Sequence, residues 1–308
     1  MKIGLQISSF TWPGGDGELG PTLTRICRAA DDVGFDSIWV MDHLFQIRSV
    51  GEVEEPMLDG MTALGFMAAH TRRARLGLMV GAVPYRHSGL WIKATTTLDV
   101  LSEGRAWFGI GAAWNVEEAR SLGVPFPELP DRFRLLEDTL RMARQAWSGD
   151  GKPGEAFRGK SVRATRLMNS PQVLSRPRVP ILVGGGGERT TLRLVARYAD
   201  ACNVFGAPDM LRHKFSVLRA HCDDVGRAYD SIERTNLSTI SITPDGSRGS
   251  LTPSKLVERL GNWAEAGSHH TIFAVRGVAD ISKLELIGRD VLPQVRELGE
   301  PSPLSHTP

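Results

Sequence analysis

The sequence predicts an α/β fold, a closed (β/α)8 TIM barrel. Three observations predict it. Eight short apolar segments alternate with amphipathic ones along the whole chain, which is the pattern of parallel strands joined by helices. No two neighbouring strands are joined by a tight hairpin turn. The length of 308 residues, large for one core, is ordinary for this barrel. A doubly wound open sheet is the alternative.

The strands are recognised by short runs of apolar and β-branched residues. They are expected at 3–7, 37–40, 75–80, 105–110, 181–183, 200–204, 237–242 and 270–275. The helices follow from apolar residues spaced three and four apart and from Pro and Gly at their ends. They are expected at 21–33, 60–71, 89–101, 132–147, 190–198, 210–225, 253–266 and 281–298. Because parallel barrel strands end on one face, residues after these strands should build one site.

Residues 1–298 are therefore interpreted as one barrel domain. The segment at about 149–180, rich in Gly, Pro and Arg, is either a small hairpin insertion or an interdomain linker. The tail, 299–308, is expected to be disordered.

Composition narrows the class of protein. The net charge of +2 is small and evenly spread, which disfavours nucleic acid or a membrane surface as partner. The three cysteines form no close pair and no metal spacing, so a reduced, cytoplasmic setting is expected. No signal peptide and no long apolar span is recognisable.

The most informative stretch is the run Gly184–Gly187, between a predicted strand and a predicted helix. Such a turn brings backbone N–H groups to the positive end of a helix and can hold an anion; a flexible linker is the alternative. The run has Arg189, and the run from Gly109 has Trp114, where a dinucleotide fingerprint needs its third glycine. A phosphate grip for a flavin-like cofactor fits better.

Asp42 and His43 follow the second predicted strand. A histidine there can exchange a proton near neutral pH, or it can simply cap the loop. His269 and His270 are adjacent and should point to opposite faces. No cluster has metal spacing, and no serine has a nucleophile-elbow context. Glu117 and Glu118 are expected to be solvated, unless one reaches the barrel mouth.

Seven segments together resemble the luciferase-like monooxygenase superfamily, and in particular its coenzyme F420-dependent oxidoreductases. They cover nearly the whole chain in the order of the family. The segments are 40–46, 76–80 with 85–87, 98–105, 108–114, 123–127, 180–187 and 199–203.

The resemblance implies that F420, with FMN as the alternative, lies at the carboxyl end of the barrel. Its tail would lie near the glycine run and its ring near strands two to four, backed by a non-proline cis peptide. His43 is the implied catalytic residue, and Trp39, Trp114 and Tyr85 are expected as apolar walls. The implied cofactor-binding residues are Asp42, Met79, Val80, Gly81, Gly111, Ala112, Ala113, Trp114, Gly184, Gly185, Gly186, Gly187 and Glu188.

The chain departs from the resembled pattern at Trp114, where sugar-phosphate dehydrogenases of the group carry a glutamate. Leu122, Ser88 and Gly89 also differ from common patterns near the pocket entrance. The leading hypothesis is hydride transfer between C5 of F420 and a small organic substrate, in a homodimer. A monooxygenase using FMNH2 is the second hypothesis, and a flavin-binding protein without turnover is the third.

Overall fold

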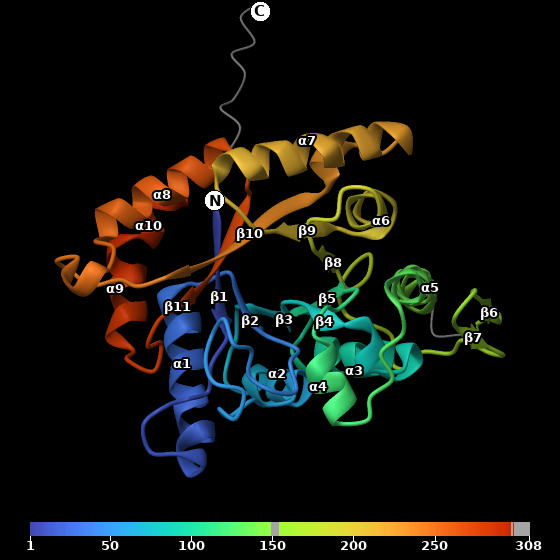
Figure 1. Ribbon diagram of the computed structural model, residues 1–308, viewed down its shortest axis with the longest axis horizontal. Helices are drawn as coiled ribbons and strands as arrows, with labels where there is room; N and C mark the ends of the chain where they lie inside the picture. The colour runs from blue at the N-terminus through green and yellow to red at the C-terminus, as the bar shows by residue number, and fades with distance from the viewer. Residues whose placement is uncertain (149–153, 297, 299–308) are drawn as a thin grey trace, which may run out of the picture.

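The computed structural model describes residues 1–148, 154–296 and 298. Within them, eight parallel strands form a closed barrel flanked by helices (Figure 1). Pairing runs in order from β1 to β11, and contacts β1–β11 and β3–β5 close the ring. The predicted barrel is therefore confirmed, and the open sheet is excluded. The predicted tail at 299–308 lies outside the described residues.

The barrel strands agree with the predicted ones to within a few residues at most ends. They are β1 (Lys2–Ile7), β2 (Ser37–Val40), β3 (Arg75–Leu78), β4 (Gly81–Ala82), β5 (Ala106–Gly111), β8 (Ile181–Gly184), β9 (Ala201–Val204), β10 (Glu233–Ile240) and β11 (His270–Val275). Segment β4 continues the line of β3 after a break at Met79–Val80. Strand β10 starts four residues before its predicted start, because the polar residues from Glu233 to Asn236 pair with β9.

The helices surround the strands in the expected alternation. They are α1 (Leu19–Val33), α2 (Gly60–Ala68), α3 (Ser88–Leu101), α5 (Leu129–Trp147), α6 (Thr191–Tyr198), α7 (Pro208–Asp224), α8 (Pro253–Glu265), α9 (Ser282–Asp290) and α10 (Leu292–Val295). One further short helix, α4 (Val116–Ser121), was not predicted. It follows β5 directly and so stands at the carboxyl end of the barrel.

The irregular segment before β8 contains a small antiparallel hairpin, β6 (Phe157–Arg158) with β7 (Arg163–Ala164). It lies beside α5 at the edge of the molecule (Figure 1). The described part of the segment therefore contains a hairpin. The first residues of that segment, 149–153, lie outside the described residues.

The core has two parts. A large cluster fills the space between strands and helices, and a small one fills the inside of the barrel. Trp39 belongs to the inner cluster and is fully buried, with its Nε1 donating to Ser37 Oγ at 2.6 Å. The prediction that Trp39 forms a wall of the pocket is therefore wrong. Its side chain points from β2 into the barrel interior, below the strand ends.

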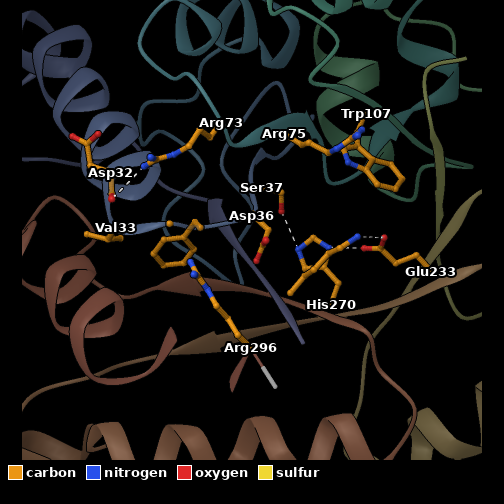
Figure 2. Close-up of a pocket in the computed structure, with 13 residues that line it drawn as sticks. Asp32, Val33, Asp36, Ser37, Arg73, Arg75, Trp107, Glu233, His270 and Arg296 are labelled. Carbon is orange, nitrogen blue, oxygen red and sulfur yellow. Dashed lines mark hydrogen bonds and ion pairs between the residues drawn. The ribbon is translucent and has the colours of Figure 1, made fainter. Parts of the chain in front are cut away.

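A polar network lies at the amino-terminal end of the barrel, beside a cavity of about 530 Å³ (Figure 2). His270 Nε2 lies 3.0 Å from Ser37 Oγ, and its Nδ1 lies 2.9 Å from Glu233 Oε1. Glu233 Oε2 accepts from Lys2 Nζ at 2.7 Å. Burial alone would raise the pKa of Glu233, but the contacts with His270 and Lys2 outweigh it and lower the pKa to about 2. The network thus ties β1, β2, β10 and β11 together.

We expect Glu233→Gln to lower the free energy of unfolding by up to about 3 kcal/mol at neutral pH, since the depressed pKa is a stability contribution. The folded-state pKa lies below the ordinary value of 4.5. The contribution is therefore complete above pH 4.5 and is lost as the pH falls toward 2. Urea unfolding as a function of pH measures the difference, with Glu54→Gln, an exposed glutamate, as control. An equal deficit at every pH would contradict the electrostatic explanation.

Candidate active site

A cavity of about 970 Å³ opens at the carboxyl ends of the barrel strands. Of the predicted site residues, all but one line it: Asp42, His43, Met79, Val80, Gly111, Ala112, Ala113, Trp114, Gly184, Gly185, Gly186, Gly187 and Glu188. The exception is Gly81, which is buried in the barrel wall, where a Cβ would lie 3.0 Å from the Gly109 carbonyl oxygen. Segments far apart in the sequence thus converge on one concave surface.

The wall of this cavity contains a non-proline cis peptide between Met79 and Val80, at the predicted place. The Val80 side chain packs against the backbone of two neighbouring strands. A Cβ on Gly184 would lie 2.7 Å from both Val80 methyl carbons, and one on Gly111 would lie 3.0 Å from one of them. These two positions therefore need glycine because Val80 approaches them closely.

The glycine run leads from β8 toward the start of α6 along the cavity. Gly185 has a φ of 122°, a conformation that side chains disfavour. Thr190, the residue before α6, makes no side-chain cap to the helix. Lys214 also lines the cavity at this end. A helix start without a side-chain cap, preceded by a glycine turn and with a lysine beside it, has the chemistry of an anion-binding turn.

Glu188 closes this turn against α7. Its Oε1 accepts hydrogen bonds from Lys214 Nζ at 2.6 Å and His213 Nε2 at 2.9 Å, and these two contacts lower its pKa. Its backbone oxygen lies 2.8 Å from His221 Nε2. His213 and His221 thus hold the glycine turn in place.

Asp42 is almost fully buried and its carboxylate has protein partners. Its Oδ2 accepts from the Ala82 backbone N–H at 2.8 Å and from Arg86 Nη1 at 2.5 Å. Arg86 also pairs with Asp59 at 2.7 Å. Asp42 therefore anchors the segment that follows β4 and presents little free carboxylate to the cavity.

His43 points the other way, toward α4. Its Nδ1 lies 2.7 Å from Glu118 Oε1, and its ring meets Trp114 edge-on at 5.5 Å between centroids. Glu118 Oε1 also accepts from the Tyr85 hydroxyl at 2.6 Å. Its other oxygen accepts from the backbone N–H groups of Leu44 at 2.6 Å and Phe45 at 3.1 Å. Every hydrogen bond on this carboxylate is thus one that it accepts.

Glu118 is fully buried, so the expectation that it is solvated is wrong, and the alternative of a glutamate at the barrel mouth holds for it. Glu117, by contrast, is exposed. Burial alone would raise the pKa of Glu118, but hydrogen bonds from His43 and Tyr85 outweigh it and place the pKa below its ordinary value. Burial and the same carboxylate raise the pKa of Tyr85. An ionised Glu118 makes His43 Nδ1 the donor and leaves Nε2 as the ring atom free for chemistry.

The sequence contains one indication of the position of Glu118, its spacing from the helix cap Asn115, and this spacing does not distinguish a solvated side chain from a buried one. Asn115 caps α4 by accepting from the Glu117 N–H at 3.1 Å, and a glutamate three residues after a cap commonly returns to the cap itself. That spacing indicates a solvated helix start. In this fold the side chain turns instead into the cavity wall, because the loop after β2 lies against α4.

The mouth of the cavity is lined by apolar side chains. Tyr85 lines it, as predicted for a wall residue, together with Ile47, Val50, Leu129, Phe133 and Phe205. Trp114, Phe205, Leu129 and Val50 remain 66%, 60%, 47% and 43% exposed. No three His, Cys, Asp or Glu side chains in the described ranges gather as a metal site would require.

A closed barrel with a glycine turn and a carboxylate-bound histidine at the carboxyl ends of its strands has the architecture of a barrel enzyme. A family model described as luciferase-like monooxygenase matches residues 1–247. The chain belongs to this family.

Three similar proteins illustrate the family. One relative, "F420-dependent glucose-6-phosphate dehydrogenase" from Kineococcus radiotolerans, is 30% identical over 270 residues, 86% of this chain and 73% of the relative. The coenzyme F420-dependent tetrahydromethanopterin reductase of Methanopyrus kandleri has a similar fold, with a TM-score of 0.76 at 17% identity, covering 95% and 98% of the two chains. The FMN-bound oxygenating constituent of 3,6-diketocamphane monooxygenase from Pseudomonas putida gives 0.72 at 17%, covering 95% and 98%.

The helices of the described residues contain no segment with both the length and the apolar character needed to cross a bilayer.

Proposed function

We propose that the protein is an F420-dependent oxidoreductase that transfers a hydride between the deazaflavin C5 and a small organic substrate. The observation that carries the proposal is the single cavity lined by both the glycine turn and His43, whose ring is held from behind by Glu118. The F420 dependence of similar proteins supports the choice of cofactor.

The residues present fit such a cofactor. The turn from Gly184 to Gly187 offers backbone N–H groups to a phosphate, with the Lys214–Glu188 ion pair beside it. The cis peptide between Met79 and Val80, both of which line the cavity, and the apolar walls suit a flat ring. When bound, F420 would donate a hydride from C5 in its reduced form or accept one at C5 in its oxidised form.

The protein's own part is to hold and move a proton. Glu118 holds His43 through Nδ1, so His43 Nε2 is oriented to donate a proton to a substrate oxygen or to accept one from it. Tyr85 and two backbone N–H groups fix the carboxylate in turn. The exposed aromatic and aliphatic side chains would exclude water once substrate is bound.

Side-by-side titration of the purified protein with F420 and FMN tests the cofactor. F420 should bind at low micromolar or lower concentration and FMN more weakly. A preference for FMN, with oxygen-dependent turnover of its reduced form, would instead support the monooxygenase hypothesis. The titration with FMN is included because the protein has a fold similar to that of an FMN-bound enzyme.

We expect Gly184→Ala to weaken F420 binding by about tenfold, because an overpacked site costs about 1–3 kcal/mol. The new Cβ would lie 2.7 Å from the Val80 methyl groups and push that side chain out of the cavity wall. Fluorescence titration measures the affinity. Gly65→Ala, on α2 with open space around it, is the matched control. Unchanged affinity for the Gly184 variant would show that the Val80 surface does not contact the cofactor.

Three further predictions stay proposals. The protein is a cytoplasmic homodimer, and residues 1–298 form one domain with an insertion. Light scattering coupled to size-exclusion chromatography tests the homodimer, and cell fractionation tests the cytoplasmic location. A single unfolding transition by calorimetry is expected for one domain.

A further inference from the structure

The cavity mouth is unusually apolar for a surface in contact with water. Trp114, Leu129, Phe205 and Val50 come from four separate segments, all line the same cavity, and each keeps more than two fifths of its surface exposed. Exposed apolar side chains that gather around a concavity mark a surface that a ligand covers. Trp114 stands directly beside His43, at 5.5 Å between ring centroids. The apolar surface therefore reaches the proposed reacting position.

The charges of the cavity are already paired. Asp42 is bound to Arg86, and His43 is bound to Glu118. At the glycine run Lys214 is bound to Glu188. Among the described lining residues, Arg189 is the one charged side chain without an ion pair, and it lies on the glycine turn rather than beside His43. An anionic group placed beside His43 would lose its hydration without gaining a cation, which is costly.

We propose that the substrate is an uncharged, predominantly apolar carbonyl compound, or the corresponding alcohol, whose oxygen faces His43. The inference rests on the proposed function and deepens it. It separates this chain from the sugar-phosphate substrate named for its relatives. The difference follows from the side chains of this cavity, where an exposed tryptophan occupies the position next to the histidine.

The reaction balances with the residues at hand. In the reducing direction the carbonyl carbon gains a hydride from reduced F420 and forms a C–H bond. The π electron pair moves to the oxygen, which takes a proton from His43 Nε2. The carbonyl compound is reduced to the alcohol, and the cofactor is oxidised. His43 recovers its proton from solvent.

A smaller cavity of about 290 Å³ adjoins the first and shares Gln6, Ser8, Val50, Thr239 and Ala274 with it. It is lined by hydroxyl groups and by Arg276, which follows β11 and is exposed. An anionic substrate would be expected to depend on this arginine. A neutral apolar substrate should not, and this contrast gives the proposal a clear test.

The first experiment compares matched substrates with the holoenzyme. Reoxidation of reduced F420 is followed with cyclohexanone, its methyl- and ethyl-substituted analogues, its ring-carboxylated analogue and the oxidised lactone of glucose 6-phosphate. We expect kcat/KM to rise about fourfold for each added methylene, the equivalent of one buried CH₂. The carboxylated ketone should be used at least about tenfold less well than cyclohexanone. Equal or better use of either anionic compound would overturn the proposal.

The second experiment measures binding without turnover. Cyclohexanone and its carboxylated analogue are titrated by calorimetry into the protein with oxidised F420, which has no hydride to give. Trp114→Ser and Phe205→Ser should each weaken binding of the neutral ketone about tenfold, since each removes a large apolar contact. Leu101→Ser, an exposed leucine on α3 that does not line the cavity, is the control. Arg276→Ala should leave ketone binding unchanged, and a loss there would contradict the proposal.

The two proposals fail in different ways. If F420 does not bind, the proposed function is wrong, whatever the ketones do. If F420 binds and the anionic compounds are preferred, the proposed function stands and the apolar substrate is wrong. The variant Phe205→Lys distinguishes the two cases further. Under the proposal, the new cation should raise kcat/KM for the carboxylated ketone about tenfold. If the site already accepts anionic substrates, the variant should not raise it.

Discussion

Replacing His43 with alanine is expected to lower the rate of hydride transfer by about two to four orders of magnitude, the usual contribution of a general acid or base. His43 is the cavity residue whose Nδ1 is held by a buried carboxylate, so Nε2 is oriented for proton exchange. The affinity for F420 should change little, because the glycine turn that would hold its tail is formed by other residues. Single-turnover oxidation of reduced F420 with cyclohexanone measures the rate, and fluorescence titration measures the affinity.

Added imidazole provides the control for this variant. If His43 moves a proton, free imidazole should restore part of the lost rate in His43→Ala and should not affect the wild type. A rate unchanged by the substitution would contradict the proton role. If the cofactor also binds as tightly as before and no substrate is turned over by either protein, the non-catalytic binding protein becomes the better interpretation.

The barrel was predictable because its signals are local and repeated. Runs such as 270–275 show apolar, β-branched composition, and the helices show regular apolar spacing, so element type follows from short windows of sequence. The ends were less predictable. Strand β10 begins at Glu233 because its first, polar residues pair with the neighbouring strand β9, which composition near the strand does not reveal. The break after β3 was expected only through the family resemblance.

The residues of the candidate site also differ in how predictable they were. The glycine run and His43 were found because strand ends share a face in a barrel, which is a property of topology. Glu118 and the buried position of Trp39 were missed because each depends on a side-chain direction. Glu118 turns from α4 toward the loop after β2, and Trp39 turns into the barrel interior. A direction of this kind is set by packing against segments distant in the sequence.

Replacing Glu118 with glutamine is expected to reduce both stability and rate. The amide keeps one acceptor, but its NH₂ group faces either the N–H groups of Leu44 and Phe45 or the ring of His43, and neither arrangement satisfies all the donors. We expect a loss of about 1–3 kcal/mol in the free energy of unfolding. The rate should fall by about 10–100-fold, as for other residues that orient a reacting group. Urea unfolding and single-turnover kinetics measure the two effects.

The pH dependence of stability tests the electrostatic role of Glu118. The folded-state pKa of Glu118 lies below its ordinary value, so its contribution to stability is complete above the unfolded-state pKa and is lost as the pH falls through the folded-state pKa. The stability deficit of Glu118→Gln should therefore shrink toward acid pH. Glu117→Gln, at the exposed neighbouring position, should leave the stability profile unchanged. A deficit for Glu118→Gln that is the same at every pH would contradict the electrostatic role of Glu118.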